Sequence, residues 1–252
     1  MNKIGHTRKK SDPLGKDFLP RKEMDTMLDL TSLREQVYHY IRGEMHNGNL
    51  LQGSYINVKE MSQQLGISKT PLRDAIIQLE CEGFVSILPR RGVLVNKLTL
   101  ADIKNSVEIV GALEAAAIVS AFDKLGLSHI EEMEHLNSAM ITEINNENFE
   151  RYYELNTTFH DIFLNLSGNK ELRRIVMPIK QRLYDFPRRA YIKEWELAHS
   201  DEHVQFIEFI KRGKRDEAAS LWRNSHWSFT VHEKFIRQFY PFDQERPAAE
   251  NF

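Results

Sequence analysis

The sequence predicts a mainly α-helical protein, with an N-terminal winged helix-turn-helix followed by an all-α bundle of about six or seven helices. Over residues 26–98 helical periodicity gives way to a strand-turn-strand pattern, whereas over residues 99–240 the apolar residues keep helical spacing. A chain of 252 residues, 41% of them hydrophobic, can bury two cores of this size. We expect residues 1–25 to form a flexible arm and residues 241–252 a frayed tail.

Three helices are expected in the first part. Apolar residues at helical spacing predict the first helix over residues 33–45 and the second over residues 58–65. The tripeptide GIS then forms a turn, and the third helix runs from about Thr70 to Glu82. Pro71 suits a first helical turn, and Gly83 tolerates the left-handed conformation that ends a helix.

A β-hairpin is expected after the third helix. Residues 84–88 and 93–95 are rich in strand formers, and the tetrapeptide PRRG between them has turn chemistry. The order helix, helix, turn, helix, hairpin is that of a winged helix-turn-helix, a DNA-binding unit.

Residues 99–240 are predicted to form helices separated by glycine and proline residues. Thr99, followed three residues later by Asp102, resembles a capping box and predicts the start of a long helix. The breaks between the later helices are expected at Gly126, Ser167–Gly168, Pro178, Pro187 and Gly213.

The third helix is the candidate for reading DNA. An apolar stripe formed by Leu72, Ala75, Ile76 and Leu79 should face the core and leave the N-terminal end of this helix exposed. That end carries Lys69, Thr70 and Arg73, and the hairpin tip carries Arg90 and Arg91. Arginine can pair with guanine in the major groove, and a basic wing can reach the DNA backbone or minor groove.

The charge distribution agrees with this division of roles. Residues 1–98 hold 15 Lys+Arg and 11 Asp+Glu, a net charge of +4, and the rest holds 19 and 25, a net charge of −6. The overall charge of −2 excludes a protein that coats nucleic acid non-specifically.

The second part carries a candidate metal site. Asn156 and His160 lie four residues apart on one helix face, and His203 and His226 follow on later helices among apolar residues. Three imidazoles and an amide oxygen could hold a divalent ion, with positions left open for water or a ligand. His199 lies one helical turn before His203 on the same face and is the second choice as a ligand. The alternatives are hydrogen-bonded core histidines without a metal, and a metal-dependent hydrolase.

The segment GISKTPLRDAI…EG resembles the GVSRTPVREAL…EG signature of the GntR family of bacterial transcription regulators. The resemblance covers residues 32–98. It implies that the DNA contacts come from Lys59, Ser68, Lys69, Thr70, Arg73, Arg91 and Gly92. Lys69 stands where the family usually has Arg, and Asp74 where it has Glu, so the operator should differ in detail.

Residues 100–240 are similar to the FCD domain, the C-terminal ligand-binding domain of FadR-type members of that family. The resemblance implies that Asn156, His160, His203 and His226 bind a divalent metal ion, Zn²⁺ in the first place, with Ni²⁺ or Mn²⁺ as alternatives. It also implies a homodimer and a small-molecule effector, an organic acid by the family's default. Val110 stands where the family often has an effector-binding Arg. The candidates to replace that Arg are Arg151, Arg173, Arg182 and Arg189, among which the sequence does not choose.

Taken together, the sequence predicts a cytoplasmic, ligand-responsive transcriptional repressor that binds a palindromic operator and is not an enzyme. A single Cys fits a reducing compartment, and the sequence contains no 18-residue apolar run, so no membrane span is expected. The alternative function is a metal-dependent hydrolase using the three histidines.

Overall fold

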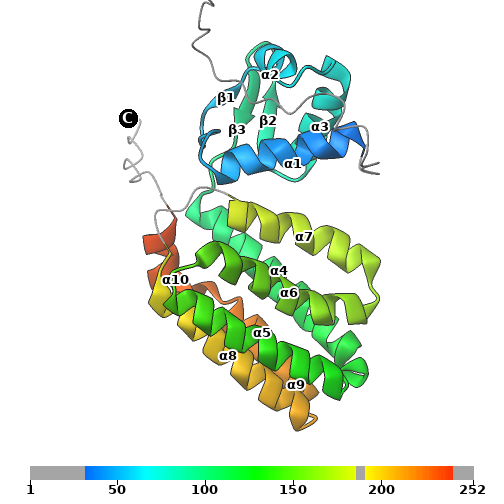
Figure 1. Cartoon of the computed structure of the whole chain (residues 1–252), viewed down its shortest axis with the longest axis vertical. Helices are drawn as coiled ribbons and strands as arrows, with labels where there is room; N and C mark the ends of the chain where they lie inside the picture. Colours follow the sequence, from blue (N-terminus) through cyan, green and yellow to red (C-terminus); the bar gives the residue numbers. More distant parts are fainter. Residues whose placement is uncertain (1–31, 186–190, 241–252) are drawn as a thin grey trace, which may run out of the picture.

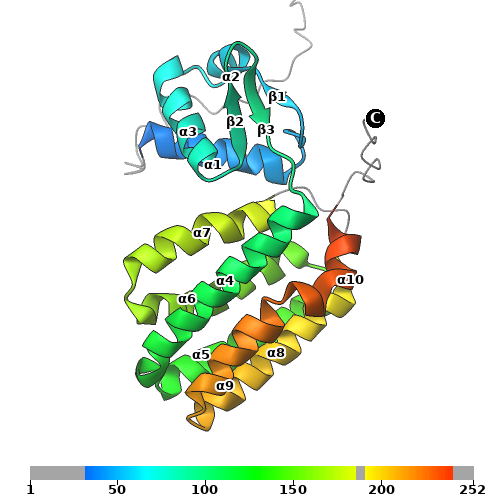
Figure 2. The same cartoon turned by 180° about the vertical axis from the view of Figure 1, so that it is seen from behind.

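A computed structural model describes residues 32–185 and 191–240. Within these ranges the chain forms a small domain of helices and strands above a helical bundle, as Figures 1 and 2 show from opposite sides. The expected arm, the expected tail and the expected break at Pro187 lie outside the described residues. The predicted fold class, a winged helix-turn-helix followed by an all-α bundle, is confirmed.

The small domain contains α1 (Leu33–His46), α2 (Val58–Gln64) and α3 (Lys69–Cys81). The predicted stripe of α3 is buried, with Leu72, Ala75 and Leu79 fully inaccessible, and it packs against α1. Gly83, at φ 80°, ends α3 in the left-handed conformation that glycine adopts without strain. The three helices therefore form where apolar spacing and turn residues predicted them.

The sheet contains one strand more than the sequence predicted. β2 (Val85–Leu88) and β3 (Gly92–Val95) form the expected hairpin, and β1 (Tyr55–Ile56) adds to β3, giving the antiparallel order β1-β3-β2. A two-residue strand has no periodicity to detect, and only its pairing with β3 makes it a strand.

The bundle consists of seven described α-helices and two short irregular segments. Their bounds are α4 (Leu100–Ala121), η1 (Phe122–Lys124), α5 (Leu127–Asn145), α6 (Phe149–Ser167), α7 (Lys170–Asp185), α8 (Lys193–Lys211), α9 (Arg215–Leu221), η2 (Trp222–His226) and α10 (Phe229–Phe239). The capping box of Thr99 and Asp102 starts α4 as predicted. Gly126, Gly168 and Gly213 lie between helices as predicted.

The break expected at Pro178 was wrong, because α7 continues through this residue. Proline lacks the N–H that would bond to the carbonyl of Arg174, which costs the helix one hydrogen bond. Leu172 and Val176 on one side of Pro178, and Leu183 on the other, are buried in the core. The packing of this apolar face outweighs the tendency of proline to end a helix.

α4 is the central helix of the bundle. It contacts α6, α7, α9, η2 and α10, and Figure 2 shows it crossing the bundle diagonally. Leu100–Lys124 is long and apolar enough to cross a membrane by length and composition alone. In this structure the apolar side chains of α4 form part of the bundle core. Glu114, in the middle of α4, is fully buried among them.

α7 connects the two domains. Both views place it directly under α1, with which it is in contact. Near its C-terminal end, Asp185 forms an ion pair with Arg42 of α1, and both side chains are 12% exposed. Arg182 of α7 lies against Gly83 and 3.6 Å from Asp102 of α4. The end of the third helix of the small domain therefore rests on α7.

Candidate metal centre and DNA-contact surface

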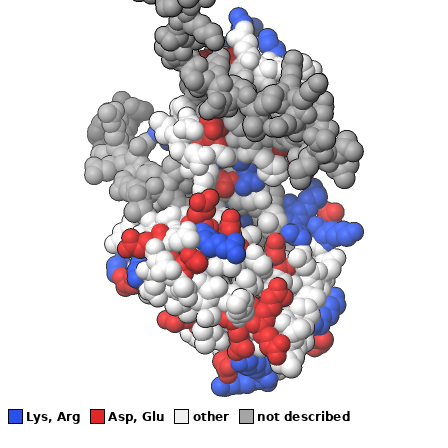
Figure 3. Space-filling view, in the orientation of Figure 1, with Lys and Arg blue, Asp and Glu red and all other residues white. Residues whose placement is uncertain are grey.

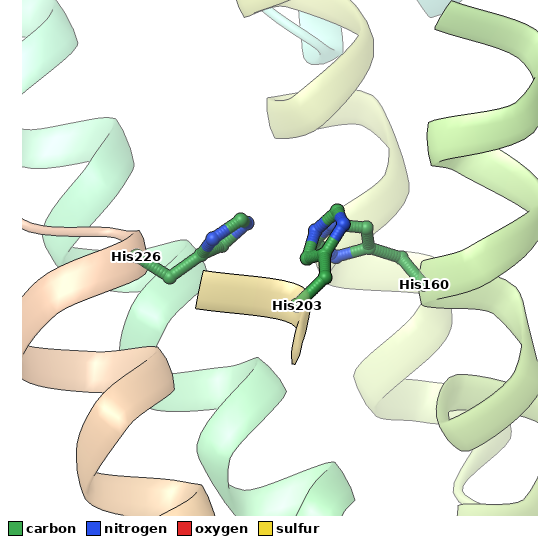
Figure 4. Close-up of side chains that lie close together, drawn as sticks. All are labelled: His160, His203 and His226. Carbon is green, nitrogen blue, oxygen red and sulfur yellow. The ribbon is translucent and has the colours of Figure 1, made fainter. Parts of the chain in front are cut away.

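Three of the predicted metal ligands lie together in the core of the bundle. His160 comes from α6, His203 from α8 and His226 from η2, and Figure 4 shows their rings turned toward one another. One nitrogen from each ring lies within 4.8 Å of the others. His160 and His203 are inaccessible, and His226 is almost so.

The local structure around the histidines fixes their rings. His226 ends η2, a π-helical turn that widens the backbone and that often occurs at functional sites. Its ring stacks on Trp222 with centroids 4.3 Å apart, and His203 stacks on Phe159 at 4.2 Å. Each ring therefore has little rotational freedom.

Asn156 lies one turn before His160 on α6, as predicted. It is buried, and its Oδ1 atom has no hydrogen-bond partner among the described residues. It borders the same cavity as His226. An unpaired buried amide oxygen is costly, so this atom fits a role as a ligand of a bound ion.

Hydrogen bonds from a second layer of residues set the tautomer of each histidine. The Nδ1 atom of His160 lies 2.8 Å from Glu114, and that of His226 lies 2.9 Å from Glu202. Since a carboxylate only accepts, both Nδ1 atoms carry the proton and donate. The Nε2 lone pairs are thereby left free, as metal-binding histidines require.

The Nδ1 atom of His203 is also protonated, and here the acceptor is the side-chain amide oxygen of Asn137. This Nδ1 atom lies 3.1 Å from Oδ1 of Asn137, whose Nδ2 donates to the carbonyl of Ser200 at 3.1 Å. The Asn137 oxygen is thus the acceptor, and His203 Nδ1 is the donor. The Nε2 atoms of both His160 and His203 are buried and have no partner among the described residues.

Burial keeps these histidines neutral. Desolvation lowers the pKa of His160, and it lowers the pKa values of His203 and His226 well below the ordinary value for histidine. The charge of Lys180 lowers the pKa of His160 further, against the opposite effect of Glu114. Neutral imidazoles with free lone pairs are the form that coordinates a metal ion.

Glu114 is hydrogen-bonded to more residues of the candidate metal centre than any ligand candidate is, and the sequence prediction did not include it. Its carboxylate accepts from His160, from Lys180 at 2.6 Å, and from the indoles of Trp222 and Trp227 at 2.9 and 2.7 Å. Burial alone would raise the pKa of Glu114, but Lys180 and His160 outweigh it and hold the pKa below its usual value. The sequence feature that could have identified Glu114 is its position as a single charged residue within the apolar segment VGALEAAAIV.

The buried charges of the centre favour a bound cation. Among the described residues around the histidines, the buried carboxylates are Glu114, Glu196 and Glu202, and the buried ammonium group is that of Lys180. With His160, His203 and His226 neutral, the formal charges of these four buried groups leave an excess of two negative charges. A divalent ion held by neutral nitrogen ligands would balance this excess, and tetrahedral sites of that kind suit Zn²⁺.

A second group of possible ligands lies beside the first. His199, Glu202 and His232 also place one atom each within 4.8 Å of one another. However, the indole of Trp195 donates to Nδ1 of His232 at 3.0 Å. Because an indole N–H only donates, Nε2 of neutral His232 carries the proton and cannot coordinate a metal. His199, which the sequence offered as an alternative ligand to His203, belongs to this second group.

A cavity adjoins the candidate metal centre. It has a volume of about 70 Å³ and is bordered by Asn156 and His226 and by Glu196, His199 and His232. A water molecule needs about 10–15 Å³ on the same measure, so a small organic molecule fits. The rest of the boundary is mostly aromatic. We call the following six residues the aromatic wall: Tyr153, Tyr184, Tyr191, Trp195, Trp227 and Phe239.

The predicted DNA-contact residues all lie on the surface of the small domain. On the helices, Lys59 is on α2, Ser68 is the N-cap of α3, and Lys69, Thr70 and Arg73 are in the first two turns of α3. On the wing, Arg90 and Arg91 lie in the β2–β3 turn, and Gly92 is the first residue of β3. Each is exposed. The side chain of Ser68, the N-cap residue of α3, makes no capping hydrogen bond.

Two residues of the wing have left-handed backbone conformations. Arg90 has φ 62° and Gly92 has φ 103°. These conformations tighten the turn and keep Arg90 and Arg91 exposed at its tip. On the face shown in Figure 3, acidic side chains are spread over the helical bundle, in agreement with the negative charge of this part of the sequence.

Two family models match the chain. Residues 33–95 match the model described as bacterial regulatory proteins of the gntR family, and residues 105–226 match the FCD domain. Together they span both domains, and the FCD match includes all three clustered histidines.

Individual relatives are similar at lower identity. The chain is 26% identical over 145 residues to the HTH-type transcriptional repressor RspR of Escherichia coli K12, covering 57% of this chain and 64% of RspR. It is 27% identical over 174 residues to the Nta operon transcriptional regulator of Aminobacter aminovorans, covering 67% of this chain and 79% of the relative. The match thus spans slightly less than two thirds of RspR.

Solved structures share the fold. McbR/YncC of E. coli aligns with a TM-score of 0.63 at 19% identity, covering 82% of this chain and 96% of that one. A GntR regulator from Rhodococcus sp. RHA1 aligns with a TM-score of 0.61 at 17% identity, covering 82% and 97%.

Proposed function

Because the chain belongs to the GntR family of bacterial regulatory proteins and carries the FCD domain of its FadR-type members, we propose that it is a ligand-responsive, DNA-binding transcriptional repressor. The winged helix would bind a palindromic operator as a homodimer in the cytoplasm. The bundle would hold a divalent metal ion and a small organic effector. The observation that carries this proposal is the pairing of an exposed α3 N-terminus with a buried histidine cluster.

The exposed end of α3 supports operator recognition. Lys69 and Arg73 form no ion pair with any described residue, so their charges are available to DNA. The first turn of α3 also presents backbone N–H groups suited to a phosphate. Arg73 would supply a bidentate contact to guanine, whereas Lys59 and the wing residues Arg90 and Arg91 would contact the backbone or minor groove.

Replacement of Arg73 tests the DNA-binding role. An operator is first selected from random duplexes with the unmodified protein, and its affinity is then measured for Arg73→Ala at fixed salt concentration. We expect the loss of about 1–3 kcal/mol of discrimination, with an unchanged fold by circular dichroism. Arg212→Ala, an exposed residue of the bundle, serves as the control and should bind normally. Normal operator affinity of Arg73→Ala would contradict the assignment.

His160, His203 and His226, with Asn156, would hold the metal ion. When bound, Zn²⁺ would supply a Lewis-acidic position for an oxygen atom of the effector, and Ni²⁺ or Mn²⁺ are the alternatives. Glu114, Glu202 and Asn137 would orient the three rings through their Nδ1 protons. The excess of buried negative charge and the unpaired Oδ1 of Asn156 support this role.

Elemental analysis of protein purified without a histidine tag tests the metal site. We expect one equivalent of metal in the native protein and its loss in a His160→Ala, His203→Ala double variant. Because Nε2 of His232 is protonated, His232→Phe should retain the metal, and this variant separates the two histidine groups. A native protein without metal, which does not take up Zn²⁺, would favour a purely structural role for the cluster.

Regulation would follow from a shift between two dimer geometries. An effector changes operator affinity only by binding the two geometries with different affinities. The surface of α4 supports dimer formation, because four exposed apolar residues at helical spacing form one stripe along it: Ile109, Ala112, Ala116 and Val119.

A metal-dependent hydrolase is the less favoured function. Such an enzyme needs a carboxylate base beside the metal-bound water. Asp161, which follows His160, forms an ion pair with Arg173 at 3.3 Å, and Glu202 is engaged by His226 and Ser225. The matching families and relatives are described as regulators, which favours DNA binding over hydrolysis.

A further inference from the structure

A groove separates α1 and α3 of the small domain from α7 of the bundle. It has a volume of about 450 Å³, within the usual range for small-molecule sites. The residues that border it include Tyr38 and His39 of α1, Gln78 of α3, and Met177 and Pro178 of α7. None of the described residues that border it also borders the cavity beside the candidate metal centre. The groove is therefore a separate place on the molecule.

Basic side chains gather in this groove. Among the described residues that border it, five are Lys or Arg and two are Glu. Figure 3 shows blue side chains over α7, beneath the small domain. Three of the five, Lys170, Arg173 and Arg174, lie in the first two turns of α7. Their spacing of three and four residues places them on one face of the helix.

The three cations of α7 are only weakly neutralised. Lys170 forms no ion pair with any described residue. Arg174 pairs with Glu171 at 2.8 Å, but these side chains are 74% and 73% exposed, and such pairs contribute little. Arg173 lies 3.3 Å from Asp161. Like charges three or four residues apart on a helix repel one another, so a bound anion would relieve this repulsion.

The other charged side chains of the groove have different roles. Arg42 is paired with Asp185, and the carboxylate of Glu82 accepts a hydrogen bond from Tyr38. These contacts hold α1 against α7 and α3. Glu35 is exposed in the first turn of α1, on the wall opposite α7. The cations of α7 are thus the part of the groove that suits an anion.

The groove lies away from the predicted DNA-contact residues. It borders α3 at Gln78 and Glu82, the C-terminal end of this helix, whereas Lys69 and Arg73 belong to its N-terminal end. Since an α-helix rises about 1.5 Å per residue, roughly 13 Å separate Arg73 from Glu82 along the axis. This separation favours a small diffusible anion over the phosphate backbone of the operator.

We propose that this groove binds a small phosphorylated molecule, with its phosphate on Lys170, Arg173 and Arg174 and its remainder over Met177 and Pro178. A phosphate ester carries about 1.5 to 2 negative charges at neutral pH and three acceptor oxygens, and arginine matches it with paired hydrogen bonds. Because the two walls belong to α1 and α7, the bound molecule ties the small domain to the bundle. This site needs no metal ion.

Binding of pyrophosphate to the metal-free full chain tests the ligand class. Calorimetry at constant ionic strength should show binding at least about tenfold tighter than that of tricarballylate, a tricarboxylate of similar charge. The affinity should fall at least about tenfold in a Lys170→Gln, Arg174→Gln double variant. An Arg212→Gln, Lys214→Gln double variant removes the same charge from exposed positions near the α8–α9 junction and should bind normally. Equal affinity for the two anions, or in the two double variants, would overturn the proposal.

Hydrogen exchange locates the bound probe. We expect pyrophosphate to slow exchange in α1 and α7 and to leave η2 unchanged. Protection of η2 would place the anion at the candidate metal centre, and protection of α7 without α1 would remove the tie between the domains. Either result would overturn the proposal.

Operator binding distinguishes a small anion from DNA. Without pyrophosphate, the Lys170→Gln, Arg174→Gln variant should bind the operator as tightly as the unmodified chain does. Weaker operator binding by this variant, together with no binding of pyrophosphate by the unmodified chain, would assign these cations to DNA and overturn the proposal. Because the calorimetry and the exchange measurements use metal-free protein, their outcome is independent of the proposed metal site.

Discussion

At the scale of single residues, Glu114 sets the hydrogen bonding and charge of the candidate metal centre. One fully buried carboxylate accepts four hydrogen bonds from donors on α6, α7 and the η2 region. It orients His160, neutralises Lys180 and anchors two indoles. A buried charge is tolerated only when its partners are this complete, and removal of one partner leaves the others unpaired.

We therefore expect Glu114→Gln to be destabilising. The amide keeps the size of the side chain but leaves the ammonium of Lys180, which is 3% exposed, without a counter-charge. The expected cost is about 3–5 kcal/mol of unfolding free energy, measured by urea denaturation of the metal-free protein. Glu108→Gln, an exposed position on the same helix, should change stability by less than about 0.5 kcal/mol. Equal stability of the two variants would contradict this role of Glu114.

At the scale of elements, the contact between α4 and η2 brings Glu114 within reach of Trp227. α4 approaches η2 closely at Gly111, where an added Cβ atom would lie 2.9 Å from Cβ of Trp227 and 3.5 Å from the backbone of Arg223. The π-helical turn places Trp222 and His226 on the side that faces α4. A glycine in the middle of an apolar helix is explained by this approach.

Substitution of Gly111 should separate α4 from η2. Gly111→Val improves intrinsic helix propensity, so any loss of stability comes from the clash with Trp227. We expect a loss of about 1–3 kcal/mol, together with weaker Zn²⁺ binding because His226 moves with η2. Ala101→Val, exposed in the first turn of α4, is the control. A Gly111→Val protein with native stability and native zinc affinity would show that the contact is unimportant.

At the scale of the whole molecule, α7 joins the candidate metal centre to the winged-helix domain. Lys180 contacts Glu114 at one point of the helix, and Asp185, little more than one turn further, pairs with Arg42 of α1. Both ends of this connection are largely buried. A change at the centre can therefore bias the position of α1, and by linkage DNA should bias metal affinity equally.

Hydrogen exchange measured with and without Zn²⁺ tests this connection. We expect metal to slow exchange in α6, α7 and α1 of the unmodified chain. In Arg42→Gln the metal should still bind and slow exchange in α6 and α7, while the effect on α1 is lost. Arg34→Gln, exposed on α1, should behave as the unmodified chain. Undiminished protection of α1 in Arg42→Gln would show that the coupling takes another route.

The sequence alone determined the order of elements and the identity of three clustered histidines. The apolar stripe of α3, the left-handed Gly83 and the capping box of Thr99 and Asp102 depend on spacings of a few residues. Such preferences act within one or two turns of backbone, so they can be recognised without a fold. For the same reason β1, which exists only through its pairing with β3, was missed.

Only the tertiary structure decided how the histidines are used. Glu114 and Trp227 are 113 residues apart, and Glu202 and His226 are 24 apart, yet these contacts fix the charge balance and the tautomers. The donor to His232, the indole of Trp195, likewise comes from another helix. Hydrogen-bond direction depends on which atoms meet across packed helices, and residue spacing along a chain does not specify that.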